Sequence, residues 1–234
     1  MIDLSNLDFE YPRSAFRLNI ESLSIPAGQK LAIIGPSGSG KTTLLNLLAG
    51  IASPRSGQIN VGGVDVASLT DRQRRDFRIA NIGFVFQQFE LLDYLNVKKN
   101  ILLPFYINPS LAESFSVSQR ERQAASLAQA MGIGDKLNRY PAKLSQGEKQ
   151  RVAICRALCI EPKLILADEP TGNLDPDNKL KILQLLFDQA DANGQTLVCV
   201  THDMAILDGF DRVLDFAEFR CSNEAAAPAG GHQA

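Results

Sequence analysis

The sequence predicts an α/β fold with a mostly parallel core sheet, an antiparallel N-terminal β-subdomain and an inserted α-helical subdomain. Three observations support this prediction. A glycine-rich turn follows an apolar strand and precedes a helix at residues 31–49, and strand and helix patterns alternate again from Leu164. The region from about 87 to 142 contains little strand signal, so the inserted helical subdomain is expected at about 88–160. Strands that alternate with helices are typical of parallel sheets, in which each helix covers a face of the sheet.

The glycine-rich turn matches the pattern of a phosphate-binding loop, which predicts a P-loop NTPase. Residues 35–42 match G-x-x-x-x-G-K-[ST], and glycines allow backbone N–H groups to close around phosphate oxygens. The helix expected from Lys41 to about Ala49 directs its positive N-terminal end at the same phosphates. The residues predicted to contact the nucleotide are Gly35, Pro36, Ser37, Gly38, Ser39, Gly40, Lys41, Thr42 and Thr43.

The N-terminal segments alternate between apolar and polar residues, as half-buried strands do. Alternation over residues 2–7 and 16–25 predicts a strand pair, and Gly62-Gly63 predicts a hairpin turn. Thr70 and Gln73 form a capping-box pattern before a charged helix, and residues 82–86 form a buried apolar run. This part of the chain is therefore expected to supply the antiparallel subdomain and one core strand.

The inserted region is expected to be helical, with Ser118 and Glu121 as the capping box of its clearest helix. The α/β pattern then resumes with a strand at 164–168, a helix at about 177–192, a strand at 197–201 and a last strand at Val213-Leu214. We expect one domain over residues 1–221 and a disordered Ala/Pro/Gly-rich tail from 222 to 234.

Composition narrows the classes of function. The chain has 234 residues, 45% of them hydrophobic, and a net charge of −2, so no nucleic-acid partner is expected. The arginines at 72, 74, 75 and 78 alternate with acidic residues, which favours a solvated helix face. No leader peptide and no membrane-spanning stretch is expected. Four cysteines without a C-x-x-C pair favour small buried residues over a zinc site.

Two further segments carry chemistry. The apolar run 164–167 ends in Asp168 and Glu169, where α/β folds place ligands; Asp168 is suited to Mg²⁺ and Glu169 to activation of water as a general base. The segment Leu144–Glu148 predicts a helix start capped by Ser145 and Glu148. Because a helix N-terminus also attracts anions, the cap and a phosphate contact are compatible.

Together these motifs resemble the ATP-binding cassette (ABC) ATPases over nearly the whole chain. The corresponding segments are Gly35–Thr42 for Walker A, Leu164–Glu169 for Walker B, Leu144–Glu148 for the LSGGQ signature, Gln87 for the Q-loop, Asn173–Asp175 for the D-loop, His202 for the switch histidine and Tyr11 for the aromatic under adenine. In the signature, Gln146 and Glu148 depart from the family pattern, whereas Ser145 and Gly147 are retained. For Tyr11, an exposed strand-end tyrosine is the alternative, with Phe16 as substitute for the stacking role.

The resemblance implies ATP and Mg²⁺ as ligands. Lys41, Glu169 and His202 are expected to be catalytic, and Thr42, Gln87 and Asp168 to hold the metal. Ser145, Gly147 and Asp175 are expected to contact the nucleotide of a second copy, because one chain supplies only half of each site. The chain is therefore expected to form a homodimer through ATP.

Residues 84–88 and 168–175 most resemble the lipoprotein-release, macrolide-export and cell-division group of the family. That resemblance implies an integral membrane permease subunit as partner and a location at the cytoplasmic face of the inner membrane. A soluble ABC ATPase acting on nucleic acid or ribosomes, a phosphotransferase, and the ATPase of an importer remain the alternatives.

Overall fold

The strands of the protein form two five-stranded sheets. The computed structural model describes residues 1–12, 16–172 and 174–223. One sheet is antiparallel, with the order β10-β2-β1-β4-β5, and the other is parallel throughout, with the order β6-β7-β8-β3-β9. The predicted parallel core sheet and antiparallel subdomain are thus confirmed. The strands are β1 Ile2–Glu10, β2 Phe16–Ile25, β3 Lys30–Ile34, β4 Ser56–Val61, β5 Val64–Asp65, β6 Ile82–Val85, β7 Leu164–Asp168, β8 Thr196–Val200, β9 Arg212–Asp215 and β10 Arg220–Asn223.

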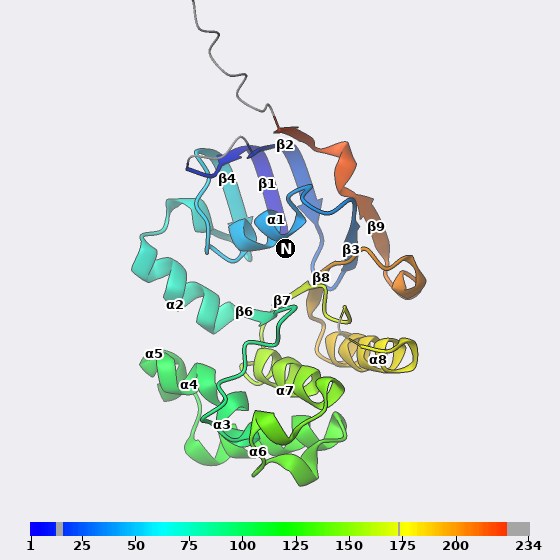
Figure 1. Ribbon diagram of the computed structural model, residues 1–234. Helices are drawn as coiled ribbons and strands as arrows, with labels where there is room; N and C mark the ends of the chain where they lie inside the picture. Colours follow the sequence, from blue (N-terminus) through cyan, green and yellow to red (C-terminus); the bar gives the residue numbers. More distant parts are fainter. Residues whose placement is uncertain (13–15, 173, 224–234) are drawn as a thin grey trace, which may run out of the picture.

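The helices are distributed unequally around the sheets. The α-helices are α1 Lys41–Leu48, α2 Asp71–Asn81, α3 Val97–Ile101, α4 Leu103–Ile107, α5 Pro109–Glu113, α6 Val117–Ala130, α7 Gln146–Leu158 and α8 Pro176–Ala192, with short 3₁₀ turns at Val66–Ser68, Gly134–Lys136, Pro141–Lys143, Met204–Ile206 and Phe216–Glu218. Five of them, α3 to α7, come between β6 and β7 in the chain. In space they gather below the parallel sheet (Figure 1).

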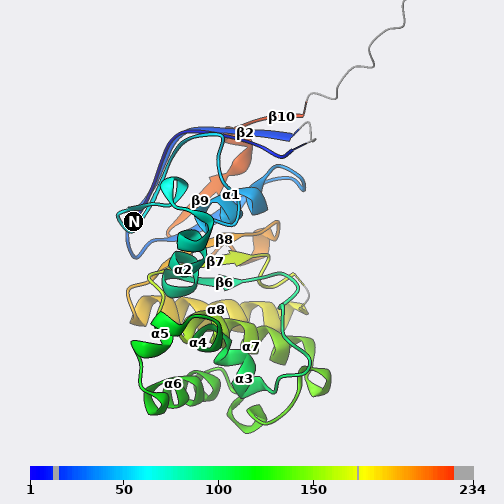
Figure 2. The same ribbon diagram turned by 90° about the vertical axis from the view of Figure 1, so that its left-hand side faces the viewer.

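Helix α1 is enclosed between the two sheets (Figures 1 and 2). Its four leucines, at 44, 45, 47 and 48, have no exposed surface. They share one hydrophobic cluster with β1, β2 and β4 on one side and with β3, β7 and β8 on the other. Because closely packed interiors resist displacement, the glycine-rich turn that precedes α1 is attached to a fixed element.

The opposite face of the parallel sheet is covered by α7 and α8, and the other inserted helices, α3 to α6, pack beneath them (Figure 1). Ile165, Ala167 and Leu197 face this second cluster, which also contains Val152 of α7 and Leu186 of α8. Strands β7 and β8 are apolar along nearly their whole length because both faces of the sheet are covered. Helix α7 therefore joins the sheet to the insertion.

Two details differ from the sequence predictions. Helix α6 begins at Val117, and its capping box is formed by Ser116 and Gln119, not by Ser118 and Glu121. Ser222 and Asn223, assigned to the tail, belong to β10, which pairs with β2. Residues 224–234, on which the rest of the predicted tail falls, lie outside the described residues, as does Asn173 of the predicted D-loop.

The arginines of α2 differ from prediction as well. Arg78 Nη1 donates to the carbonyl oxygens of Ala49 (3.2 Å) and Gly50 (3.4 Å), and Arg74 Nη1 donates to Leu69 O at 3.2 Å. Both side chains are partly buried, so only Arg72 and Arg75 lie on a solvated face. The long arginine stems pack against the protein while their guanidinium groups satisfy carbonyls at the C-terminal end of α1 and before α2.

Three of the four cysteines lie in the interior of the protein. Cys155, Cys159 and Cys199 are free and buried, and burial raises the pKa of each thiol. Within the described ranges, no group of three or more His, Cys, Asp or Glu residues could hold a metal ion. None of the helices in those ranges combines the length and the hydrophobicity needed to cross a membrane.

The chain turns sharply where β7 ends. Glu169 has a φ of +46°, in the left-handed region that residues with a Cβ seldom occupy. Its N–H donates to Val200 O at 3.0 Å, which ties the turn to the end of β8. The backbone strain is thus held in place by the sheet at a position where the sequence predicts a general base.

This strain should reverse the usual order of stability between glycine and alanine. Glu169→Gly and Glu169→Ala both remove the carboxylate, but only alanine keeps a Cβ in the left-handed conformation. We expect the glycine variant to be more stable by about 1 kcal/mol, measured by urea unfolding. At Asp188, an exposed position inside α8, the alanine variant should be the more stable one. If the alanine variant were the more stable one at both positions, the backbone of Glu169 would not be strained.

Candidate nucleotide site

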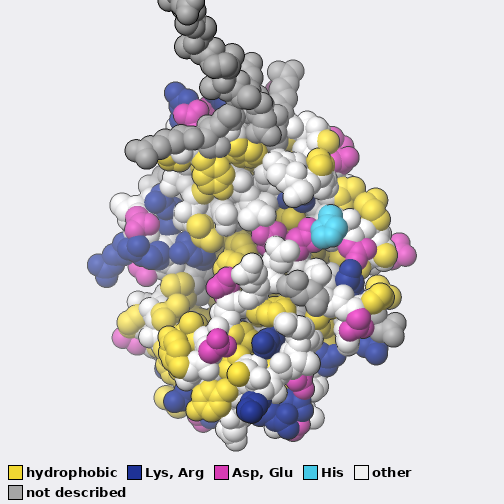
Figure 3. Space-filling view, in the orientation of Figure 1, with side chains coloured by type: hydrophobic (Ala, Val, Ile, Leu, Met, Phe, Trp, Pro, Cys, Tyr) yellow, Lys and Arg dark blue, Asp and Glu magenta, His cyan; other side chains and the backbone are white. Residues whose placement is uncertain are grey.

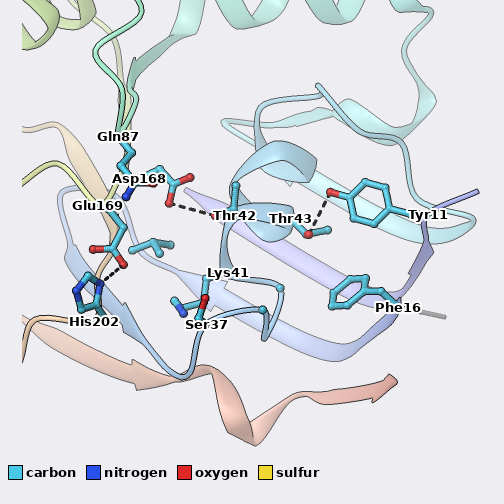
Figure 4. Close-up of a pocket in the computed structure, with 13 residues that line it drawn as sticks. Tyr11, Phe16, Ser37, Lys41, Thr42, Thr43, Gln87, Asp168, Glu169 and His202 are labelled. Carbon is cyan, nitrogen blue, oxygen red and sulfur yellow. Dashed lines mark hydrogen bonds and ion pairs between the residues drawn. The ribbon is translucent and has the colours of Figure 1, made fainter. Parts of the chain in front are cut away.

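The predicted phosphate loop opens into a pocket of about 590 Å³. It lies where β3, β7 and β8 reach their C-terminal ends, which is where parallel sheets bind ligands. Its lining residues come from five separate segments of the chain: Tyr11, Phe16, Ser37, Gly38, Gly40, Lys41, Thr42, Thr43, Gln87, Asp168, Glu169, Val200 and His202. The structure thus brings together most of the residues that the sequence singled out (Figure 4).

The loop is shaped by its glycines. Gly40 has a φ of +103°, and a Cβ there would lie 2.6 Å from Phe16 Cζ. An alanine would therefore meet both backbone strain and a ring in close contact. The predicted residues Gly35, Pro36 and Ser39 belong to the same loop but do not line the pocket. Gly35 lies against Phe216, Asp215 and the Ser39 side chain instead.

Lys41 is held inside the loop that it follows. Its side chain is buried, and Nζ donates to the carbonyl oxygens of Gly35 and Pro36, both at 2.8 Å. These two bonds satisfy a buried ammonium group and fix the loop around it. A phosphate bound at the loop would compete with these carbonyls for the same cation, so the lysine is already directed at the pocket.

At one end of the pocket, acidic and basic groups converge (Figure 4). Thr42 Oγ1 donates to Asp168 Oδ1 at 3.2 Å, and His202 Nδ1 lies 2.7 Å from Glu169 Oε1. Burial raises the pKa of Asp168; the Thr42 hydroxyl opposes this shift, and the neighbouring Glu169 adds to it. Glu169 is 14% exposed, whereas His202 is 69% exposed, so the histidine can move without disturbing the core.

At the other end, two aromatic rings stand beside α1 (Figure 4). Tyr11 and Phe16 have ring centroids 5.9 Å apart, and the Tyr11 hydroxyl lies 3.2 Å from Thr43 Oγ1. Tyr11 is 38% exposed, which leaves a ring face available for stacking. Sequence reasoning had ranked Phe16 second to Tyr11, but both rings line the pocket.

Three predicted residues lie apart from the pocket. Ser145, Gly147 and Asp175 are absent from its lining. Ser145 caps the exposed start of α7 through its bond from Glu148 N at 3.2 Å, and Asp175 caps α8 through Asn178 N at 3.1 Å. The two helix starts are neighbours, since the atom nearest to an added Cβ on Gly147 is Leu174 Cδ2.

The departure at position 148 is accommodated within the cap. Glu148 accepts a hydrogen bond from Ser145 N at 2.7 Å and lies 3.5 Å from Lys136 Nζ. Burial opposes ionisation of this carboxyl, but the Ser145 N–H and Lys136 outweigh it and hold the pKa of Glu148 below its usual value. The glutamate thus completes a capping box and stays charged.

Sequence reasoning missed two features that contribute to the site. Val200 lines the pocket beside His202, and Arg156 of α7 binds the backbone of the segment that follows Gln87. Neither has a local signal: an apolar residue at a strand end and an arginine in a helix are common. Only the tertiary fold places them near the motifs.

Comparison with known proteins identifies the family. The model of the ABC transporter family matches residues 18–172. The lipoprotein-releasing system ATP-binding protein LolD 1 of Rhodopirellula baltica is 40% identical over 211 residues, which are 89% of this chain and 90% of that protein. The macrolide export ATP-binding/permease protein MacB of the same organism is 45% identical over 195 residues, 82% of this chain; they span only 28% of that longer protein.

Solved structures agree with the sequence relatives. The dimeric, post-hydrolysis state of the ATP-binding cassette MJ0796, bound to ADP and Pi, superposes with a TM-score of 0.81 at 33% identity; the match covers 92% of this chain and 94% of that one. The resemblance to the lipoprotein-release and macrolide-export group is confirmed by these relatives. The chain is an ABC ATPase and belongs to the ABC transporter family.

Proposed function

We propose that this chain is the ATP-hydrolysing subunit of a membrane complex and that two copies close on two ATP molecules. One observation carries this proposal. Loop, carboxylates and switch histidine share one pocket, whereas Ser145 and Gly147 lie at an exposed helix start outside it. A second copy, related by a two-fold axis, would bring its α7 start to the first copy's pocket, and the reverse.

The described pocket offers a separate group for each part of ATP. The loop N–H groups and Lys41 bind the phosphates, while the rings of Tyr11 and Phe16 stack on the base at the far end. The N-termini of α1 and of the second copy's α7 both direct positive dipole ends at the phosphates. ADP would lose the contacts made to the γ-phosphate, so ATP holds the dimer better than ADP.

Mg²⁺ fits one end of the pocket. The Thr42 hydroxyl and the Asp168 carboxylate are 3.2 Å apart, and oxygen donors of these types are what Mg²⁺ prefers. Gln87, which lines the same end of the pocket, is the third proposed ligand. When bound, the ion would neutralise charge on the outer phosphates.

Glu169 and His202 supply the groups for hydrolysis. Glu169 accepts a proton from the attacking water, and its strained backbone directs the carboxylate into the pocket. His202 lies 2.7 Å from Glu169 and orients it. Asp175 stands at the start of α8, beside the signature helix, where it would contact the opposing copy when the dimer closes.

Glu169→Gln should separate binding from hydrolysis. The amide keeps the shape of the side chain but cannot take a proton, so the hydrolysis rate should fall by ~10²–10⁴. The variant should form a stable dimer with ATP and remain a monomer with ADP, measured by light scattering coupled to gel filtration. Lys41→Ala, which removes the phosphate-binding cation, is the control that should fail to dimerise with either nucleotide. Wild-type hydrolysis by Glu169→Gln would refute the assigned role.

Asp168 should govern the Mg²⁺ requirement. Asp168→Asn removes a charged oxygen, so the Mg²⁺ concentration at half-maximal hydrolysis should rise at least about tenfold. Phosphate release at a series of Mg²⁺ concentrations measures this. Thr42→Ser keeps the hydroxyl and is the matched control, with a wild-type requirement. In the wild type, acidification should weaken Mg²⁺ binding at a higher pH than for an ordinary aspartate, because burial raises the pKa of Asp168. An unchanged requirement in Asp168→Asn would remove this residue from the metal site.

A membrane subunit would dock in an apolar groove between the sheet and the insertion. The groove, of about 230 Å³, is lined mainly by apolar side chains, including Phe84 of β6, Phe86 just after this strand and Leu103 of α4. Ile107 also lines it and is 57% exposed. Hydrophobic side chains on this part of the molecule are visible at the left of Figure 3. The groove adjoins the segment after Gln87, so an amphipathic helix of a membrane protein seated there would lie beside the nucleotide sensor.

A charge in this groove should abolish membrane association. Ile107→Asp should lower saturable binding to urea-washed membranes of the source cells about tenfold, measured by co-sedimentation, because it buries an unpaired carboxylate in the docked state. Val117→Asp, 66% exposed on α6, should bind as the wild type does. Binding to protein-free liposomes, or to trypsin-treated membranes, would contradict a protein partner. Such a partner in the inner membrane would hold the chain at its cytoplasmic face.

The alternatives named above have less support. A net charge of −2 does not favour binding to nucleic acid or ribosomes. Import and export differ in the membrane subunit, so the charge and geometry of this chain are compatible with both. We propose the lipoprotein-release and macrolide-export type of complex because the relatives of that group match residues throughout the cassette.

A further inference from the structure

A buried arginine connects the signature helix to the segment that follows Gln87. Arg156, on α7, is 8% exposed. Its Nη2 donates to Phe89 O at 2.6 Å, and its Nη1 donates to Glu90 O. Both acceptors are backbone carbonyls of consecutive residues, so the guanidinium group grips the chain itself rather than a side chain.

The gripped residues have an unusual backbone. Phe89 and Glu90 have φ values of +60° and +49°. Two successive residues with a Cβ rarely adopt this left-handed conformation without an external partner. The planar, rigid fork of an arginine can reach two neighbouring carbonyls at once, which the single ammonium group of a lysine does less well. The arginine and the bend in the segment therefore suit one another.

Breaking the two hydrogen bonds of Arg156 is energetically unfavourable. Within the described residues, no carboxylate forms an ion pair with Arg156. The two carbonyls thus replace the water that a buried cation would otherwise require. If the segment moved away from α7 on its own, the guanidinium group would be left without these acceptors. Movement of the segment and of the helix together preserves both bonds.

The two ends of α7 consequently have different roles: its start carries the signature, and its end contacts the segment after Gln87. Its first turn carries Gly147 and is capped by Ser145, and its last part carries Arg156. The segment gripped by Arg156 begins two residues after Gln87, which lines the nucleotide pocket. Farther along, Asn100 of α3 holds the segment by donating to Leu92 O at 3.1 Å and Leu95 O at 2.9 Å. The two hydrogen bonds from Arg156 tie the start of the segment to the signature helix.

We propose that Arg156 is a positioning residue that transmits occupancy of the nucleotide pocket from Gln87 to Ser145 and Gly147 of the same copy. When Gln87 responds to a bound nucleotide, the gripped segment moves α7 as a rigid rod, so that the signature is presented to the second copy. The inference rests on the function proposed above, in which Ser145 and Gly147 close the dimer. Arg156 itself touches neither nucleotide nor metal.

Arg156→Lys tests the transmission. In the Glu169→Gln background, the ATP concentration at half-maximal dimerisation should rise about tenfold, while ATP affinity measured on dilute monomer stays unchanged. Arg151→Lys is the matched control: it lies on the same helix, and Arg151 Nη1 donates to Met131 O of another segment at 2.9 Å. This control should shift neither quantity. Equal midpoints in the two lysine variants, or parallel loss of monomer affinity in Arg156→Lys, would overturn the proposal.

A second measurement needs no change at Arg156 and applies even if that variant does not fold. Hydrogen exchange is followed on monomeric Glu169→Gln protein, below the concentration at which light scattering detects dimers. ATP should alter exchange at residues 87–90 and at the start of α7 with the same ATP dependence. A response confined to 87–90 would overturn the proposal. Failure of the Glu169→Gln protein to dimerise with ATP at any concentration would instead refute the proposed function.

Discussion

The position of helix α1 between two sheets is the constraint on which the site depends. Leu44, Leu45, Leu47 and Leu48 have no exposed surface and are packed from both sides. Displacing the helix would open cavities against two sheets at once, which closely packed cores resist. The turn that precedes α1 is fixed as a result, and the bonds from Lys41 to Gly35 and Pro36 keep its curvature. The phosphate site is therefore preformed by the hydrophobic packing of α1 together with the two Lys41 bonds.

The parallel sheet also positions the two carboxylates, and one of them, Glu169, has a strained backbone. Asp168 ends β7 in a regular conformation, whereas Glu169 must adopt a positive φ one residue later. The bond from Glu169 N to Val200 O holds that conformation, and the turn at Thr201 and His202 follows directly on β8. Adjacent parallel strands thus deliver a base and its histidine to one place. The strain is the consequence of turning the chain at the edge where ligands bind.

Features that depend on neighbouring residues in sequence could be predicted, whereas long-range contacts could not. The phosphate loop, the Thr70 cap and the apolar strands are encoded within a few residues each. Ser118 with Glu121 also fits a capping box, yet Ser116 with Gln119 forms it, because two overlapping patterns satisfy one rule. Roles for Arg78 and Arg156 have no local signal: their acceptors lie 29 and 67 residues away in the chain, at Ala49 and Phe89. Charge alternation over residues 72–78 predicted a solvated helix face and gave no sign of the contacts that Arg78 makes with Ala49 and Gly50.

These two arginines connect the groove near Gln87 to the nucleotide pocket. Arg78 lines the groove and donates to the last carbonyls of the helix that follows the phosphate loop; Arg156 lines it from the other side and donates to the segment that follows Gln87. Each of these cations is thus bonded to an element whose other end reaches the nucleotide pocket. A partner helix in the groove would contact the stems of both side chains, while their guanidinium groups stay with their carbonyls. Because α1 is held between two sheets, closing or widening the groove would shift the segment after Gln87 relative to it. A docked membrane subunit and a bound nucleotide would in this way each be sensitive to the other.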